Sequence, residues 1–284
     1  MLANIDPDQV QNILQTLPST EKQELLKLLE DLDKAKTREN SKTDFLTFVR
    51  HVWPAFIAGR HHRTMADAFE RVANGELKRL IVNMPPRHTK SEFASYLFPA
   101  WFLGKYPQKK VIQTAHTAEL AVGFGRKVRN LFENQDFKDI FPDIDLSTDS
   151  KAAGRWNTSK GGDYFAIGVG GAVTGKGADV LIIDDPHSEQ DAAVGAYNPE
   201  VFDKVYEWYT SGPRQRLQPG GAIIIVMTRW STRDLTGQII KKSIEREGSD
   251  DWELIELPAI MPSGNPIWPE FWPLTQLEAL KAEL

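Results

Sequence analysis

A lysine and a serine stand side by side at positions 90 and 91, just before a run of apolar residues with helical spacing. The apolar segment "RLIVN" precedes them with the composition of a buried strand, and "MPPRHT" joins the two parts. A loop that leads from a strand into a helix can aim backbone N–H groups at an anion beside the positive end of the helix dipole. Lysine there would neutralise phosphate oxygens, and the serine hydroxyl would bind Mg²⁺. The pattern predicts a phosphate-binding loop at residues 84–91, the candidate phosphate loop.

The composition of this loop leaves an alternative open. The standard pattern G-x-x-x-x-G-K-[S/T] has two glycines, and here Met84 and Thr89 occupy their positions. A β-branched threonine resists the positive φ that glycine adopts freely. The alternative is an ordinary strand-to-helix turn with a solvated basic cluster. On the phosphate interpretation, the nucleotide-binding residues are Arg87, His88, Thr89, Lys90 and Ser91.

Two adjacent aspartates, Asp184 and Asp185, end the apolar run of "GADVLIIDDPH" about ninety residues later. Open α/β sheets bind their ligands at the carboxyl ends of the strands. Asp184 would hold Mg²⁺ through water, and Asp185 would polarise the water that attacks a γ-phosphate. Acidic residues also end strands as solvated turns. The loop and the acidic pair in this order, however, together favour nucleotide hydrolysis over two unrelated turns.

A third motif, "AIIIVMTRWSTRDL", presents Thr228 and Arg229 at the end of another apolar run. A polar strand end beside the same crevice can sense the γ-phosphate and transmit its loss to the next helix. The alternative is a helix N-cap at Ser231 or Thr232 with an exposed arginine.

These motifs require a sheet that carries them on neighbouring strands. From about residue 44 onward, apolar runs alternate with helical patterns, which predicts an α/β fold with a mostly parallel sheet covered on both faces. The expected strands are 77–84, 110–115, 164–168, 180–184, 222–228 and 252–257, and the expected helices are 64–74, 90–103, 117–133, 198–211 and 232–246. A capping box at Thr20–Gln23 and a leucine stripe predict an N-terminal helical segment, whose stripe we expect to pack on its own domain.

Composition limits the class of protein. The chain has 284 residues, of which 41% are hydrophobic and 26% charged, so it is long enough for one large α/β domain with an appendage. A net charge of -5 argues against a free-standing nucleic-acid binder. The absence of cysteine excludes disulfides and thiolate zinc sites. No run reaches the roughly 20 apolar residues of a membrane span, so we expect a cytoplasmic protein without a membrane partner.

The chain resembles the large terminase subunits of tailed bacteriophages from about residue 45 to its end. The resemblance rests on four segments in order: "HHRTMADAFERVANGELKRLIVNMPPRHTKSEFASYLFPAWFLG", "WNTSKGGDYFAIGVGGAVTGKGADVLIIDDP", "YEWYTSGPRQRLQPGGAIIIVMTRW" and "LPAIMPSGNPIWPE". It implies a P-loop NTPase fold and a DNA-packaging motor that hydrolyses ATP, with Mg²⁺, to drive viral double-stranded DNA into a procapsid. The implied partners are the DNA, the portal protein, the small terminase subunit and further copies of this chain. The implied location is the host cell cytoplasm, transiently at the portal.

The resemblance also implies roles for single residues. The family loop usually reads P-P-R-x-G-K-S, so Thr89 stands where glycine is usual. Asp184 matches the acid associated with Mg²⁺, Asp185 takes the place of the catalytic acid, and residues 228–230 match the coupling segment. His61 and His62 fall where the family approaches the nucleotide base. A basic residue that completes the neighbouring subunit's site would be Arg126, Arg129 or Lys176, and Arg87 would act within its own chain.

The resemblance further predicts how the chain is divided. We expect a helical preface at 1–42, the ATPase domain at 43–262, and the start of a linker toward a nuclease domain at 263–284. We expect no nuclease activity from these residues, and a slowly hydrolysing monomer in isolation. A two-domain helicase would need more length. A phosphotransferase and a nucleotide-binding structural domain without turnover remain the alternatives.

Overall fold

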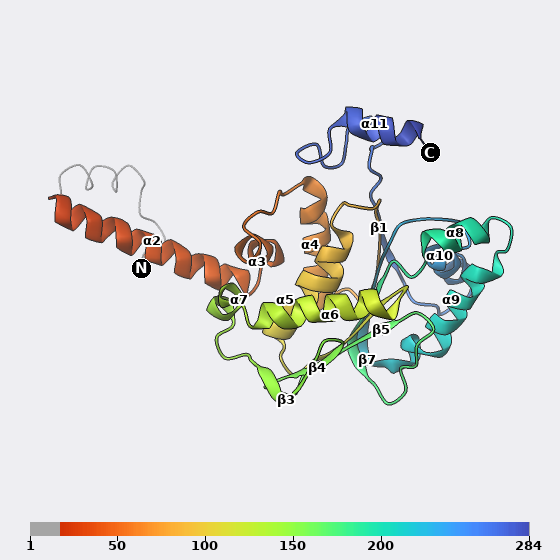
Figure 1. Ribbon diagram of the computed structural model, residues 1–284, viewed down its shortest axis with the longest axis horizontal. Helices are drawn as coiled ribbons and strands as arrows, with labels where there is room; N and C mark the ends of the chain where they lie inside the picture. The colour runs from red at the N-terminus through yellow and green to blue at the C-terminus, as the bar shows by residue number, and fades with distance from the viewer. Residues whose placement is uncertain (1–17, 284) are drawn as a thin grey trace.

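The computed structural model describes residues 18–283. The first 17 residues of the predicted preface at 1–42 therefore lie outside the described residues. The centre is an eight-stranded sheet in the order β3-β4-β5-β2-β6-β7-β1-β8 (Figure 1). Its strands are β1 (Arg79–Asn83), β2 (Lys110–Ala115), β3 (Leu146–Ala152), β4 (Arg155–Thr158), β5 (Asp163–Gly168), β6 (Ala178–Asp184), β7 (Leu217–Met227) and β8 (Glu253–Glu256). The α/β fold with a mostly parallel sheet is confirmed.

The six strands predicted from apolar runs are all present, and they are mutually parallel. The two strands that the sequence did not indicate, β3 and β4, form an antiparallel hairpin that extends the sheet beyond β5. Their segment "LSTDSKAAGRWNT" is polar and lacks an apolar run. An edge hairpin needs fewer buried side chains than a central strand, so hydrophobic pattern alone does not reveal it.

Both faces of the central strands are buried. Along β7, Ile224 and Val226 belong to one apolar cluster, whereas Ile223 and Ile225 belong to a second one. Side chains alternate between the faces of a strand, so a run of consecutive isoleucines implies cover on both sides. The first cluster contains side chains of the helices from α3 to α7, both included, and the second contains side chains of α9 and α10.

The helices lie in two layers around the sheet (Figure 1). The first layer comprises α3 (Phe45–Val52), α4 (Arg60–Ala73), a π-helical turn η1 (Glu92–Leu97) continuing into α5 (Phe98–Lys105), α6 (Ala118–Phe132) and α7 (Gln135–Ile140). The second comprises α8 (Glu189–Gly195), α9 (Glu200–Ser211), the 3₁₀ turn η2 (Pro213–Arg216) and α10 (Leu235–Glu245), while α11 (Leu274–Ala282) follows β8. The five predicted helices are therefore present, with ends shifted by a few residues.

The N-terminal helix α2 (Ser19–Ser41) extends away from the sheet and its helices (Figure 1). Only its last turn is anchored, where Ser41 is buried and its carbonyl accepts a hydrogen bond of 2.9 Å from Trp101 Nε1. Leu26 and Leu32 of the leucine stripe are 41% and 46% exposed. The helical segment is confirmed, but the expectation that the leucine stripe packs on the domain is wrong for Leu26 and Leu32, whereas Leu25 and Leu29 are half-buried.

Within residues 18–283, every helix is too short or too polar to cross a bilayer.

Candidate functional site

The candidate site forms where three neighbouring strands end. β7 lies between β6 and β1, and all three run in the same direction. Asn83, the last residue of β1, pairs with Met227 of β7, and Asp184, the last of β6, pairs with Val226. The candidate phosphate loop, the acidic pair and Thr228 therefore leave the sheet at the same level.

Lys90 connects the three strand ends. Its ammonium lies 2.9 Å from Asp185 Oδ2 and donates a hydrogen bond of 3.1 Å to Thr228 Oγ1. The backbone N–H of Thr228 donates to Asp185 Oδ1 at 2.8 Å. Lys90 is only 4% exposed, so its charge is neutralised by an ion pair that water screens weakly. One lysine, one carboxylate and one threonine thus form a closed polar triangle.

Asp184 is held by two hydroxyl groups from the helix after the loop. Ser91 Oγ donates to its Oδ1 and Ser95 Oγ donates to its Oδ2, each at 2.8 Å. Burial, reinforced by the negative charge of Asp185, raises the pKa of Asp184 to about 7, and the two serine hydrogen bonds and Lys90 act against this rise. The group is therefore a buried acid close to its midpoint near neutral pH.

Ser91 and Asp184 fit a magnesium ion. Both offer oxygen atoms, the hard ligands that Mg²⁺ prefers, and nucleotide sites commonly supply only one or two protein ligands beside water and phosphate. A positive ion next to Asp184 would also stabilise its charged form, which burial disfavours. Ser95 then acts as an outer partner that orients the carboxylate.

The backbone of the candidate phosphate loop is strained at two residues. Arg87 has φ 63° and Thr89 has φ 69°, both in the left-handed region. This conformation costs an L-residue roughly 1–2 kcal/mol, and a β-branched side chain makes it a clear outlier. Thr89 therefore adopts a backbone conformation that glycine takes freely, despite the resistance expected of its side chain. Asp185, with φ 38°, is strained as well, and strain of this kind gathers at functional sites.

Two buried histidines, His62 and His88, make hydrogen bonds to the candidate phosphate loop. His88 Nδ1 lies 2.8 Å from the carbonyl of Pro86, and burial lowers the pKa of His88. His62 is fully buried, with Nδ1 2.7 Å from Gly59 N and Nε2 2.7 Å from Thr89 Oγ1. Both ring nitrogens of His62 thus contact this chain. Its role as a base contact stays a prediction.

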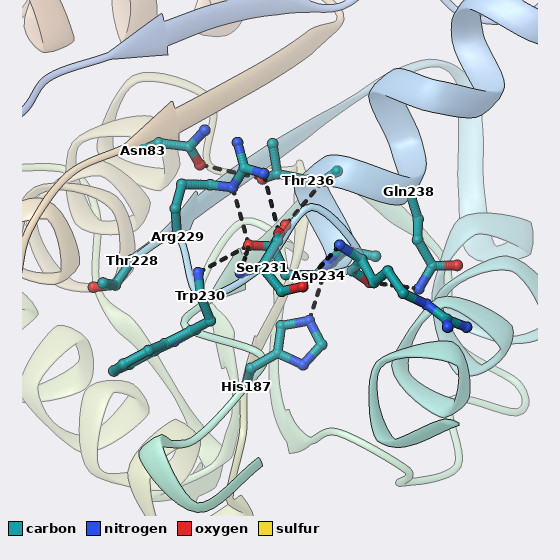
Figure 2. A network of polar contacts seen from close by, with 12 residues as sticks. Asn83, His187, Thr228, Arg229, Trp230, Ser231, Asp234, Thr236 and Gln238 are labelled. Carbon is teal, nitrogen blue, oxygen red and sulfur yellow. Dashed lines mark hydrogen bonds and ion pairs between the residues drawn. The ribbon is translucent and has the colours of Figure 1, made fainter. Parts of the chain in front are cut away.

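The coupling segment is tied to the start of α10 (Figure 2). Arg229 Nε donates to Asp234 Oδ2 at 2.9 Å, so this guanidinium is held at the start of α10, the helix that follows it. Asp234 is fully buried, and its Oδ1 caps the helix by accepting from Gly237 N at 2.9 Å. The predicted N-cap at Ser231 or Thr232 thus lies at Asp234 instead. Trp230 N and Ser231 N also donate to Asp234 Oδ2.

Two further residues, which the sequence did not single out, fix the same helix end (Figure 2). His187, two residues after Asp185, accepts at Nε2 a hydrogen bond of 2.9 Å from Leu235 N. Thr236 Oγ1 donates to Asn83 Oδ1 at 3.2 Å. The ends of β1, β6 and β7 therefore all contact the first turn of α10. The only signal in the sequence was position, because His187 comes just after one predicted strand and Asn83 lies near the end of another.

The basic residues considered for this chain's own site or for a neighbouring subunit's site lie in different places. Lys176 contacts Asp163 Oδ2 at 2.8 Å, and Asp163 begins β5. Lys176 therefore lies at the amino ends of the parallel strands, whereas Lys90 lies at their carboxyl ends. The six residues of β5, at about 3.3 Å each, separate the two levels. Arg126 is exposed on α6 and Arg87 is exposed in the loop. The structure thus brings none of the three onto the Lys90–Asp185 pair within the described chain.

The segment after residue 262 packs against the loop. Trp268 is only 4% exposed, and its ring centroid lies 5.0 Å from that of His62. Trp272 Nε1 donates to the carbonyl of Arg87 at 3.4 Å. The predicted boundary at 262/263 stays a prediction, but this segment contacts the site directly. Aromatic residues in a segment that appeared to be a linker were the signal in the sequence.

Replacing Asp184 by asparagine is expected to stabilise the metal-free protein. The folded-state pKa is raised, so the folded acid binds its proton more tightly than the unfolded one, and stability is lost as pH rises toward about 7. Asparagine removes this loss, and the gain in melting temperature should be larger at about pH 8 than at about pH 5. Thermal unfolding of both proteins at the two pH values measures it.

The matched control is Asp143→Asn, an exposed carboxylate whose replacement should leave the pH dependence of the melting temperature unchanged. A gain from Asp184→Asn that was equal at both pH values would contradict the raised pKa.

Large terminase subunits of phages are similar to this chain in sequence or in fold. No protein-family model matches the sequence. The large terminase subunit of Enterobacteria phage T3 is 24% identical over 170 residues, which make up 59% of this chain and 29% of that protein. The crystal structure of the HK97 bacteriophage large terminase matches with a TM-score of 0.50 and 11% identity, over 80% of this chain and 47% of that one.

The T3 relative supports the resemblance to large terminase subunits that the motifs indicated, and the HK97 structure supports the fold. This chain spans less than a third of the T3 relative and about half of the HK97 chain.

Proposed function

We propose that this chain is the ATPase portion of a phage large terminase, which hydrolyses ATP to drive double-stranded DNA into a procapsid. The observation that carries the proposal is the meeting of Lys90, Asp185 and Thr228 within hydrogen-bonding distance, beside the Ser91–Asp184 pair. A lysine, a hydroxyl with a carboxylate, and a second carboxylate are the groups that P-loop nucleotide hydrolysis requires.

The contacts suggest how binding prepares hydrolysis. An arriving triphosphate competes with Asp185 for the ammonium of Lys90, since both are anionic acceptors. Once Lys90 turns to the phosphates, Asp185 loses its ion-pair partner and can accept a proton from the attacking water. Mg²⁺, held by Ser91 and Asp184 as proposed above, would supply charge neutralisation at the phosphates. Thr228 donates to Asp185 and contacts Lys90, so it would register the change at both groups.

The partners and location follow from the terminase assignment. We propose that the chain acts on viral double-stranded DNA in the host cell cytoplasm, at the portal of the procapsid, together with the small subunit. Further copies of the chain would form a ring there.

The test is ATP hydrolysis by the purified chain, with and without duplex DNA. Faster phosphate release with DNA supports the motor. Transfer of phosphate to a metabolite would replace it with the phosphotransferase alternative, and nucleotide binding without turnover would favour a structural domain.

A basic residue from the adjacent subunit is expected to complete the site. An arginine supplied in trans contributes about 10³ to 10⁵ in rate to phosphoryl transfer. Arg126 is the exposed candidate, whereas Lys176 would first have to leave Asp163. Specific activity should therefore rise with protein concentration, and mixing inactive Lys90→Ala chains with inactive Arg126→Ala chains should restore part of it.

The matched control for this mixture replaces the Arg126→Ala chain by a Lys176→Ala chain. Because Lys176 is paired with Asp163, this variant should be active by itself, and mixing should restore no further activity. Rapid hydrolysis that did not depend on concentration, by a proven monomer, would refute the trans arrangement.

A further inference from the structure

The left-handed backbone of Thr89 needs an explanation in contacts, because threonine has no intrinsic preference for it. Glycine takes this conformation without side-chain strain, but leaves the loop free to adopt others. A threonine that is held in place would keep the loop in one conformation. Among residues 18–283, the one side-chain hydrogen bond that reaches Thr89 from outside the candidate phosphate loop comes from His62 of α4.

A chain of three hydrogen bonds runs from the start of α4 into the loop. Gly59 N–H donates to His62 Nδ1 at 2.7 Å, so this nitrogen is the acceptor and the ring proton must sit on Nε2. His62 Nε2–H then donates to Thr89 Oγ1 at 2.7 Å. The Thr89 hydroxyl keeps its own proton for the carbonyl of His88, at 2.5 Å. Each donor meets one acceptor, so the chain is fully satisfied.

The imidazole at the centre of this chain cannot readily turn away. His62 is 0% exposed, and its ring centroid lies 4.6 Å from that of Phe56 and 5.0 Å from those of Phe93 and Trp268. Burial, followed by the charge of His61, lowers the pKa of His62 to about 2. The ring therefore stays neutral in the tautomer that donates to Thr89.

We propose that His62 is a positioning residue that holds Thr89, and with it the candidate phosphate loop, in the conformation that binds phosphate. The proposal rests on the nucleotide site of the proposed function. In the usual loop, glycine reaches the left-handed conformation without strain. Here the hydrogen bond from His62 to the Thr89 hydroxyl holds the backbone of residue 89 in that conformation. Its contribution must then depend on threonine at position 89.

The test is a double-mutant cycle between positions 62 and 89. In the Thr89 protein, His62→Ala should raise the Kd of a fluorescent ATP analogue, and the KM for ATP, by about tenfold, since the half-buried Thr89 hydroxyl loses its donor. The value of kcat should change little, because His62 touches no reacting group. In a Thr89→Gly background the same substitution should change the Kd much less, since the backbone no longer needs the contact.

Three variants separate positioning from general packing. Thr89→Val keeps the β-branched shape without the hydroxyl and should imitate His62→Ala, whereas His62→Gln keeps a donor near Nε2 and should restore most of the affinity. His61→Ala removes the neighbouring buried imidazole and should have the same effect in both backgrounds. An equal loss from His62→Ala in the two backgrounds would overturn the proposal and leave His62 as core packing.

A readout without nucleotide keeps this test apart from the proposed function. Urea unfolding of the four proteins of the cycle should give non-additive midpoints if His62 and Thr89 are coupled. Additive midpoints would overturn the contact itself. If the unsubstituted chain failed to bind the ATP analogue while the midpoints were non-additive, the nucleotide site would be wrong and the His62–Thr89 contact would stand.

Discussion

Replacing Asp185 by asparagine is expected to lower kcat by about 10² to 10⁴, the contribution typical of a general base, while the affinity for Mg²⁺ and ATP is retained or raised, because asparagine no longer competes with the phosphates for Lys90. Asparagine keeps an oxygen that accepts from Thr228 N, so the strand end should hold its geometry. It cannot take a proton from water. Single-turnover kinetics and equilibrium nucleotide binding measure the two quantities separately.

Asp203→Asn is the matched control for this substitution. Asp203 also contacts a cation, Arg233, at 2.7 Å, but lies on α9 away from the strand ends and is half exposed. Its replacement should leave kcat unchanged. Asp185→Asn with full kcat would refute the assignment of the base.

Replacing Lys90 by alanine is expected to abolish turnover through lost binding. Removing one member of a buried charge pair costs about 2 to 5 kcal/mol, which corresponds to a Kd raised by roughly 30-fold to several thousand-fold. The phosphates lose the ammonium that neutralises them, and Asp185 loses its ion-pair partner. Isothermal titration with a non-hydrolysable ATP analogue measures the loss.

Lys109→Ala provides the comparison, because Lys109 pairs with Asp179 at 2.8 Å on an exposed edge of the protein. That surface pair should contribute at most about 1 kcal/mol to stability and nothing to binding. Lys90 and Asp185 have separate roles only if the first variant loses affinity and the second keeps it. Equal losses of binding in both would contradict that division.

The sequence was informative where function depends on local order along the chain. A buried strand, a basic loop and a helix appear consecutively, and parallel strands bring their carboxyl ends to one edge. Lys90, Asp184 and Thr228 could therefore be expected together before the structure was known. The observed contacts of Lys90 with both other strand ends agree with that expectation.

The sequence was silent where contacts join distant segments. Lys176 follows a glycine-rich run and lies close to the acidic pair along the chain, yet it comes before β6 and contacts Asp163 at the amino ends of the strands, opposite the site. The contact of His62 with Thr89 depends on how α4 packs against the loop. Long-range packing of this kind leaves no periodic signal in a single sequence, and neither does the polar hairpin of β3 and β4.

The buried carboxylate of Asp234 has a mechanical consequence. It receives hydrogen bonds from Arg229, Trp230 and Ser231 on one side and from Gly237 on the other, so the strand extension and the first turn of α10 form a stiff joint. The eleven residues of α10 make a rod of about 16 Å at about 1.5 Å per residue. A rotation of about 5° at the joint would swing its far end by roughly 1 Å. A shift at the end of β7 would therefore be carried along the whole length of α10.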